Sequence, residues 1–109
     1  MNKKYLTRND EMLMLAIMRL KDNAYLVTLR DFLNNNTGRK WTIGNIFVAL
    51  EKLENLEYIS SVLGEPTIKR GGKAIKYYSV TKDGIRELKK VRSIQDELWS
   101  GLYDHVFSA

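Results

Sequence analysis

Hydrophobic residues in the first half of the chain recur every three or four positions, which is the spacing of helices with one buried face. The pattern predicts three helices, over residues 9–19, 25–34 and 43–56. The first contains the run Met12 to Met18, which is apolar on every side, and a helix of that kind is buried on more than one side. Since so small a chain covers only one side with its own core, we expect the other side to contact a second subunit.

Residues that cap helices stand at the predicted ends. Thr7 and Asp10 have the spacing of a capping box, with Asn9 as a rival cap, and Thr42 precedes the third helix. The Asn-Asn-Asn-Thr-Gly run at 34–38 predicts the end of the second helix, because Asn and Gly tolerate left-handed backbone. Three short helices joined by tight turns indicate a helix-turn-helix arrangement.

The pattern changes after the third helix. Residues 58–63 and 74–80 are rich in β-branched and aromatic side chains, which predicts a hairpin with a long, basic, glycine-containing connection. Thr81 is the expected N-cap of a last helix reaching to about Val106, with apolar positions close to the heptad period. At ~1.5 Å per residue this helix would be nearly 40 Å long, too long for the domain to cover. The same helix and the first helix of a second copy would supply the missing surface.

These elements predict a mostly α fold with a small β-hairpin. We expect a winged helix-turn-helix DNA-binding domain over residues 1–80 and a long C-terminal dimerisation helix over residues 81–109, together forming one compact unit. The length of 109 residues, with 44% hydrophobic, allows one core. No apolar run approaches the roughly 20 residues of a membrane helix, and the N-terminus lacks the pattern of a signal peptide. We therefore expect a cytoplasmic protein that does not associate with membranes.

The residue types give little support to an enzyme. The chain has no Cys, which excludes disulfides, zinc-finger ligation and a thiol nucleophile. Its one histidine, His105, stands near the C-terminus, and the carboxylates fit the charge pattern of helices. We therefore predict a protein that is not an enzyme and that has no cofactor, no metal site and no catalytic residue.

The basic residues are segregated from the acidic ones. Eighteen Lys and Arg against thirteen Asp and Glu give a net charge of +5. The cations gather near the N-terminus, in the turn before the third helix and in the hairpin connection. This distribution is compatible with a polyanionic partner, although composition alone favours basic loops that are simply solvated.

Two motifs carry a resemblance to a known family. The predicted third helix opens Gly44-Asn45-Ile46-Phe47 and continues through spaced leucines to Tyr58-Ile59. The hairpin connection contains Gly71-Gly72-Lys73, and the second strand leads into the last helix through the run Tyr77 to Gly84, YYSVTKDG. With these motifs, which cover most of the chain, the sequence resembles the PadR family of bacterial winged-helix transcriptional regulators. The junction between the wing and the last helix is the most specific of them.

Three positions depart from the family pattern. Ala24 and Glu57 stand where the family has glycine, and Phe47 stands where it has tyrosine, so that no hydroxyl is available for a phosphate there. We expect the fold to follow the family, whereas individual base contacts have to be argued residue by residue.

The resemblance implies a homodimer that binds duplex DNA, with the third helix of each subunit in one of two successive major grooves of an inverted-repeat operator. Gly44 permits close backbone approach, and Asn45 can make two hydrogen bonds to adenine, although a solvated helix residue explains Asn45 equally well on sequence alone. Basic residues flank that helix on both sides. The expected DNA-contacting residues are Lys4, Tyr5, Arg39, Lys40, Thr42, Gly44, Asn45, Phe47, Val48, Lys52, Lys69, Arg70, Lys73 and Lys76.

The first and last helices are expected to form the dimer interface. Its predicted residues are Met12, Leu13, Leu15, Ala16, Leu88, Val91, Gln95, Leu98, Trp99, Leu102 and Val106. The resemblance also implies that Trp99 and Tyr103 are candidates for contact with a small aromatic effector at the dimer interface, with plain subunit packing favoured over this role.

We therefore predict a sequence-specific transcriptional regulator, with repression as the favoured sign of regulation. The alternative is a winged-helix protein–protein adaptor without a DNA role, in which the basic loops would meet an acidic partner.

Overall fold

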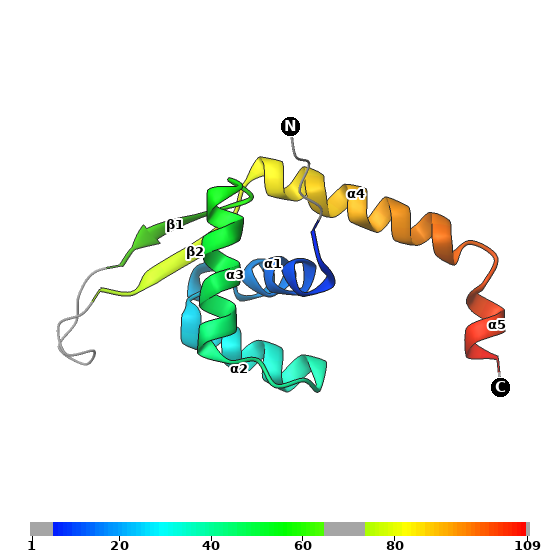
Figure 1. Ribbon diagram of the computed structural model, residues 1–109, viewed down its shortest axis with the longest axis horizontal. Helices are drawn as coiled ribbons and strands as arrows, with labels where there is room; N and C mark the ends of the chain where they lie inside the picture. The colour runs from blue at the N-terminus through cyan, green and yellow to red at the C-terminus, as the bar shows by residue number, and fades with distance from the viewer. Residues whose placement is uncertain (1–5, 65–73, 109) are drawn as a thin grey trace.

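The computed structural model of the chain describes residues 6–64 and 74–108. In that part, three helices surround the core, a two-stranded hairpin extends to one side, and a further helix leaves toward the other (Figure 1). The elements are α1 (Arg8–Leu20), the 3-10 helix η1 (Lys21–Asn23), α2 (Leu26–Thr37), α3 (Ile43–Asn55), β1 (Ile59–Leu63), β2 (Lys76–Val80), α4 (Lys82–Trp99) and α5 (Tyr103–Phe107). The predicted fold class, mostly α with a small β-hairpin in a winged helix-turn-helix, is confirmed.

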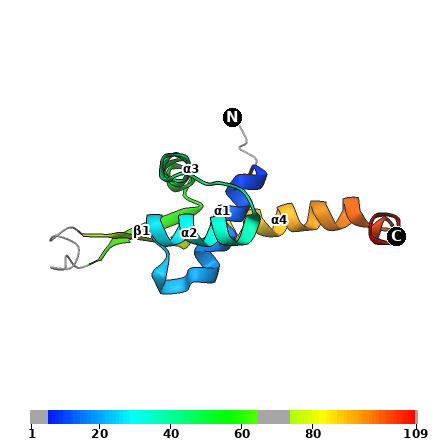
Figure 2. The ribbon, with the colours of Figure 1, turned by 90° about the horizontal axis from the view of Figure 1, so that it is seen from below.

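The core lies between α1, α2, α3 and the hairpin. Its buried hydrophobic residues are Leu13, Met14, Ala16, Ile17, Ala24, Leu29, Leu33, Trp41, Ile46, Leu50, Leu53, Ile59 and Tyr78. Burial of each large apolar side chain stabilises the fold by about 1.5–3 kcal/mol. In the view turned by 90°, α3 is seen along its axis and stands to one side of the other elements (Figure 2). One long face of α3 is therefore left without a neighbouring element.

The predicted helix caps are confirmed. The amide of Asp10 donates to Thr7 Oγ1, and the amide of Thr7 donates to Asp10 Oδ2, both at 3.0 Å, which completes the capping box of α1. Thr42 accepts from an amide in the first turn of α3, and Thr81 does the same for α4. Each cap satisfies a backbone donor that the helix leaves without an internal partner.

The predicted end of the second helix is wrong by one turn. The helix runs on through the three asparagines to Thr37 and ends where Gly38 adopts a left-handed φ of 69°. Asn36 Nδ2 donates to the carbonyl of Phe32 and Thr37 Oγ1 donates to the carbonyl of Leu33, both at 2.7 Å. These polar side chains bond back to the preceding turn, and the helix therefore tolerates them.

The prediction of one continuous last helix that reaches Val106 is also wrong. The helix α4 ends at Trp99, and Gly101, with a φ of 78°, turns the chain into the short helix α5. The indole of Trp99 stacks on Phe107 with ring centres 5.8 Å apart. Eighteen residues give α4 a length of about 27 Å, well below the predicted value.

A tight junction connects the end of α3 to the start of α4. The Thr81 hydroxyl donates to the carbonyl of Glu57 at 2.7 Å, and the Thr81 amide donates to the carbonyl of Tyr58 at 3.0 Å. A Cβ at Gly84 would lie 2.1 Å from that same Tyr58 carbonyl oxygen, so only glycine fits there. Glu57, which replaces a family glycine, has a left-handed φ of 63°. We call these four residues the α3–α4 junction.

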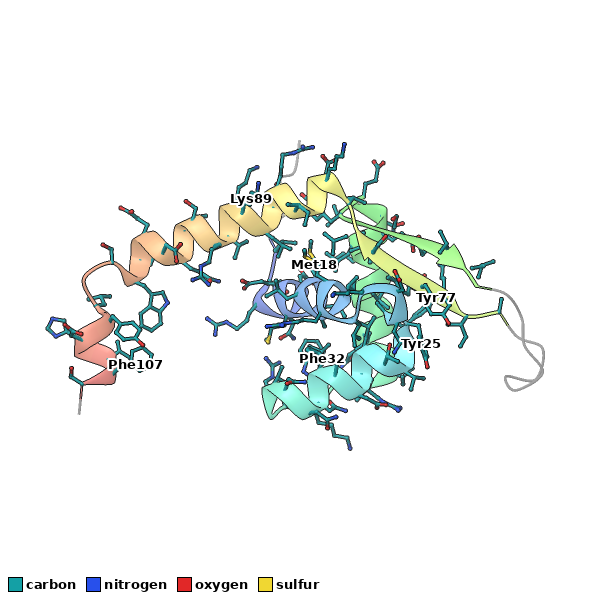
Figure 3. The ribbon with its side chains drawn as sticks, turned by 180° about the vertical axis from the view of Figure 1, so that it is seen from behind. Met18, Tyr25, Phe32, Tyr77, Lys89 and Phe107 are labelled. Carbon is teal, nitrogen blue, oxygen red and sulfur yellow. The ribbon has the colours of Figure 1, made fainter. Side chains whose placement is uncertain are left out.

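The hairpin strands pair in antiparallel register. Ile59 lies opposite Val80, and Leu63 lies opposite Lys76. Ile59 and Tyr78 face the core, while the ring of Tyr77 meets Tyr25 edge-on with centroids 5.5 Å apart (Figure 3). Tyr25 caps the start of α2. The base of the wing is therefore attached to the helical body through aromatic contacts.

Candidate nucleic-acid interface

The outward side of α3 is the candidate base-reading surface. Because α3 buries Ile46, Leu50 and Leu53, the helical period turns the opposite side toward solvent. We call this side the reading face; it consists of Gly44, Asn45, Val48, Glu51 and Asn55, all exposed. Sequence reasoning missed Glu51 and Asn55, although continuing the period from Gly44 and Val48 would have found them. The reading face offers an amide, an apolar and a carboxylate side chain within the first three turns of the helix.

Two large apolar side chains of α3 are exposed. Val48 is 64% exposed and lies on the reading face, and Phe47 is 47% exposed on its flank. Both were predicted to contact DNA. An exposed apolar side chain on a groove-entering helix suits the methyl group of thymine.

Gly44 lies in open space. A Cβ built on it meets no atom within 4 Å, and its φ lies outside the left-handed range. Glycine in a helix costs about 0.5–1 kcal/mol relative to alanine. No contact within the described part of the chain requires this glycine, which leaves room for a close external partner.

The loop before α3 carries the predicted cations Arg39 and Lys40, and both are exposed. The Arg39 guanidinium lies 5.6 Å from the centre of the Trp41 ring. Trp41 is itself buried and donates through Nε1 to Thr37 Oγ1 at 3.0 Å, which anchors the turn. Two exposed cations therefore stand in the loop that leads into the positive N-terminal end of α3, an arrangement suited to phosphate. Thr42, predicted to contact DNA, is exposed, but its hydroxyl caps the helix.

Two other predicted DNA-contacting cations form ion pairs within the chain. Lys52 Nζ lies 2.7 Å from Asp10 Oδ2, and Lys76 Nζ lies 3.5 Å from Glu54 Oε1. Sequence spacing does not reveal partners so distant along the chain, and the DNA contacts predicted for Lys52 and Lys76 stay predictions. Lys4, Tyr5, Lys69, Arg70 and Lys73 lie outside the described residues.

For two residues of α1, the predicted assignment to the dimer interface is wrong. Leu13 and Ala16 are 0% and 1% exposed within the single chain, so they belong to its own core. Met12 is half-buried, and Leu15 remains exposed as predicted. Met18, which the prediction omitted, is exposed like Leu15. In a run that is apolar on every side, periodicity cannot tell which side of the helix packs against the core and which side stays exposed.

An apolar groove of about 310 Å³ lies between α1 and the first half of α4. Its lining includes Leu15, Met18, Ile85, Leu88 and Arg92. Farther along α4, Val91 and Gln95 are half-buried and Leu98 is exposed. Beyond the end of α4, Leu102 and Val106 are exposed as well. Gln95 Nε2 donates to Glu11 Oε1 of the same chain at 3.1 Å, so its amide is already engaged.

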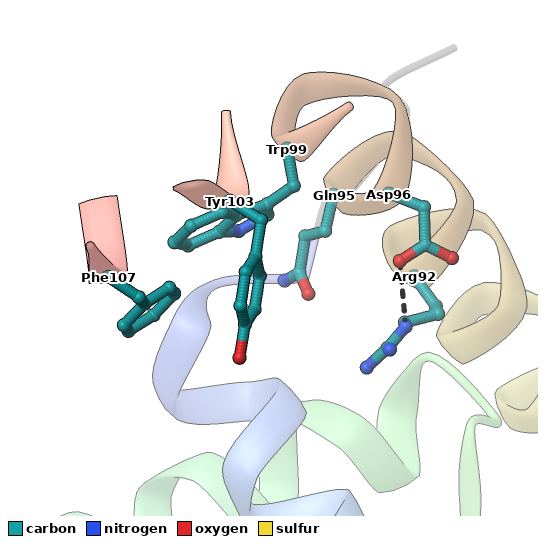
Figure 4. A pocket seen from close by; sticks show the side chains of 6 residues that line it. All are labelled: Arg92, Gln95, Asp96, Trp99, Tyr103 and Phe107. Carbon is teal, nitrogen blue, oxygen red and sulfur yellow. Dashed lines mark ion pairs between the residues drawn. The ribbon is translucent and has the colours of Figure 1, made fainter. Parts of the chain in front are cut away.

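The aromatic side chains at the tail gather around a second open pocket of about 310 Å³ (Figure 4). Trp99, Tyr103 and Phe107 lie on one side of it, and Arg92, Gln95 and Asp96 on the other. The rings of Trp99 and Phe107 are nearly parallel, with an interplanar angle of 13°. Phe107 thus covers one face of the indole that was predicted to meet a flat effector or a partner subunit.

Two searches of the described part give negative results. Residues 6–64 and 74–108 contain no group of three His, Asp or Glu side chains placed to hold a metal ion. No helix in these ranges has the length and hydropathy of a membrane span.

Comparison by sequence finds neither a matching family model nor a matching curated protein. Solved structures are similar in fold. A PadR family transcriptional regulator from Eggerthella lenta has a TM-score of 0.68 and 24% identity, over 94% of this chain and 87% of its own. A PadR-like transcriptional regulator from Bacillus cereus has a TM-score of 0.71 and 18% identity, over 93% and 92%. A PadR-like transcription factor from Bacteroides fragilis has a TM-score of 0.68 and 26% identity, over 90% and 92%.

These similarities cover at least 90% of this chain and at least 87% of each similar structure. The coverage is high in both directions, so the likeness concerns the whole fold and not a shared helix-turn-helix alone. The resemblance predicted from the sequence is confirmed: the chain has the fold of the PadR-like winged-helix transcriptional regulators.

Proposed function

We propose that this chain is a homodimeric, sequence-specific DNA-binding transcriptional regulator, with repression at an inverted-repeat operator as the favoured activity. The observation that carries the proposal is the exposed reading face of α3, with Arg39 and Lys40 at its N-terminal end. DNA recognition needs both parts, since phosphate contacts position a protein and base contacts give it specificity. The assignment is supported by the similar structures, which are described as a transcriptional regulator and a transcription factor.

The dimer is supported by the apolar surface that α4 and α1 leave exposed. Leu98 is 69% exposed and Leu15 is 46% exposed, and they lie on two helices of which neither is covered on that side. A two-fold arrangement would pair the same surface on both subunits. Binding to two successive major grooves requires the two α3 helices of the dimer to lie about 34 Å apart, one turn of DNA. In this arrangement we assign Trp99 and Tyr103 to subunit packing, and a small aromatic effector there stays a prediction.

The DNA role is tested by selection from random duplex oligonucleotides, followed by fluorescence anisotropy over a salt series. We expect an enriched palindrome and an affinity that falls steeply with salt, because each neutralised phosphate adds about −0.9 to the slope of log K against log salt. Replacing Arg39 or Lys40 with Ala should lower affinity for all sequences and flatten this slope. Lys82→Ala is the matched control, because Lys82 is equally exposed but lies in the first turn of α4, outside the loop that leads into α3.

The adaptor alternative gives a different result in the same experiment. A dimer that enriches no sequence and shows no DNA affinity at low salt would reject the regulator and favour a protein–protein role. In that case the basic loops would be tested against acidic protein partners.

The dimer is tested by sedimentation equilibrium of Leu98→Glu. The side chain is mostly exposed in the single chain, so the variant should fold, and a charge in the interface should shift the protein to monomers. Ser93→Glu, also exposed on α4 but on the opposite side from Leu98, should remain dimeric. An unchanged dimer in Leu98→Glu would reject α4 as the interface.

A further inference from the structure

An ion pair connects the first helix to the recognition helix. Lys52 Nζ of α3 lies 2.7 Å from Asp10 Oδ2 of α1, across 42 positions of sequence. The Asp10 side chain is only 3% exposed, whereas that of Lys52 is 45% exposed. The lysine therefore reaches from the surface of α3 inward to a carboxylate in the protein body.

Asp10 is held firmly in its place. Its Oδ2 also accepts the amide of Thr7 at 3.0 Å in the capping box of α1. Among the described residues, no other cation pairs with this carboxylate. A buried carboxylate needs a compensating charge, and a long lysine side chain that leaves it would expose an unpaired buried ion.

Lys52 stands where it would otherwise serve DNA binding. It follows Asn45 by two helical turns, on the same flank of α3 and about 10 Å farther along. It is also the one Lys or Arg in α3, whose sequence is IGNIFVALEKLEN. Guanine is most commonly read by Arg or Lys, so α3 depends on Lys52 for that contact.

We propose that Asp10 determines specificity by holding Lys52 away from DNA, so that α3 reads A·T pairs through Asn45 and Val48 and makes no cationic contact to guanine. This inference rests on the proposed function. Asn45 supplies the amide that pairs with adenine, and Val48 supplies the apolar contact to the thymine methyl group. Affinity for phosphate then comes from cations outside α3, such as Arg39 and Lys40.

The experiment compares four full-length proteins by random-oligonucleotide selection and by salt-dependent anisotropy: the natural sequence, Lys52→Gln, Asp10→Asn and the double variant. For Lys52→Gln we expect an affinity within about twofold of the natural protein, the same base preference and the same salt slope. Asparagine at position 10 keeps an oxygen for the Thr7 amide but releases Lys52. For Asp10→Asn we expect a salt slope steeper by about 0.9, and guanine enriched at one position of the half-site. The double variant should lose both changes.

Two results overturn the inference. One is a Lys52→Gln variant whose salt slope falls by about 0.9, because Lys52 would then already contact a phosphate. The other is a folded Asp10→Asn variant with unchanged preference and slope. If Asp10→Asn is unfolded by circular dichroism, Lys52→Gln decides alone. Failure of the proposed function is distinct, since the natural protein itself would then select no DNA.

Discussion

Asn34 holds the backbone of Trp41 through both atoms of its side-chain amide. The Trp41 amide donates to Asn34 Oδ1 at 2.6 Å, and Asn34 Nδ2 donates back to the Trp41 carbonyl at 3.4 Å. This pair closes the loop that carries Arg39 and Lys40 and fixes the start of α3. An asparagine that the sequence assigns to a helix end thus stands inside α2 and shapes the loop that we propose faces DNA.

Replacing Asn34 with Ala should reduce the free energy of unfolding by about 2 kcal/mol, since two hydrogen bonds are lost and a backbone donor is left without its partner. DNA affinity should fall as well, because the loop cations lose their fixed position. Urea unfolding and anisotropy measure the two effects. Asn35→Ala, at an exposed neighbouring position, is the control. An equal loss of stability in both variants would contradict the role of the Asn34–Trp41 hydrogen bonds.

Replacing Gly44 with Ala should raise the free energy of unfolding and weaken DNA binding. A methyl group there meets nothing in the described structure, and alanine favours the helix, so stability should rise by about 0.5–1 kcal/mol. The same methyl group should weaken DNA binding by at least several-fold, because it stands where the proposed partner approaches. Thermal unfolding and anisotropy test the pair of outcomes. Affinity that is unchanged or improved would show that DNA does not approach α3 closely at this residue.

Glu57→Gly should stabilise the protein by about 1 kcal/mol. Glu57 has a left-handed φ of 63°, a conformation that costs a side-chain-bearing residue about 1–2 kcal/mol and glycine almost nothing. Part of the gain is offset by the greater freedom of glycine in the unfolded chain. Chemical denaturation measures the change, and Glu57→Ala, which keeps a Cβ, should show no such gain. Stabilisation by alanine equal to that by glycine would rule out backbone strain as the cause.

Tyr78 should make stability depend on alkaline pH. Burial raises the pKa of its phenol above the ordinary value of 10.0, outweighing the opposite effect of nearby Lys76. The unfolded chain therefore releases this proton at lower pH than the folded chain does. Its contribution to stability is complete below pH 10 and is lost as the pH rises through the raised folded value.

The measurement is urea unfolding over a pH series from neutral into this alkaline window. The natural protein should lose stability with pH more steeply than Tyr78→Phe, which has no phenol to titrate at that position. Tyr103→Phe, at an exposed tyrosine, should follow the natural protein. Parallel curves for Tyr78→Phe and the natural protein would contradict the shift.

The sequence predicts most of the local structure. It fails where the structure depends on contacts between distant residues, or on residues that suit two conformations. The caps at Thr7, Thr42 and Thr81 follow from residue type and spacing, so they were predictable. The asparagine run gave a wrong end for the second helix. An asparagine side chain can end a helix, or it can donate a hydrogen bond to the preceding turn inside a helix. The break at Gly101 was missed because the apolar period continues beyond it.

The candidate site divides in the same way. The reading face follows from helical period alone, and the family motifs direct attention to it. Which cations are free does not follow, because the pairs Lys52–Asp10 and Lys76–Glu54 join residues far apart in the chain. A charge count cannot distinguish a lysine available to DNA from one already neutralised by the protein.

The α3–α4 junction has a mechanical consequence. Hydrogen bonds from Thr81 to the carbonyls of Glu57 and Tyr58, and the close contact at Gly84, hold the start of α4 against the residues that follow α3. The helix α4 thus moves together with α3, and the two turn about the α3–α4 junction. Because α4 is about 27 Å long, a change of a few degrees in the direction of its far end also rotates α3 and the helical core. In the proposed dimer, a change in the direction of the tail would therefore change the distance between the two α3 helices.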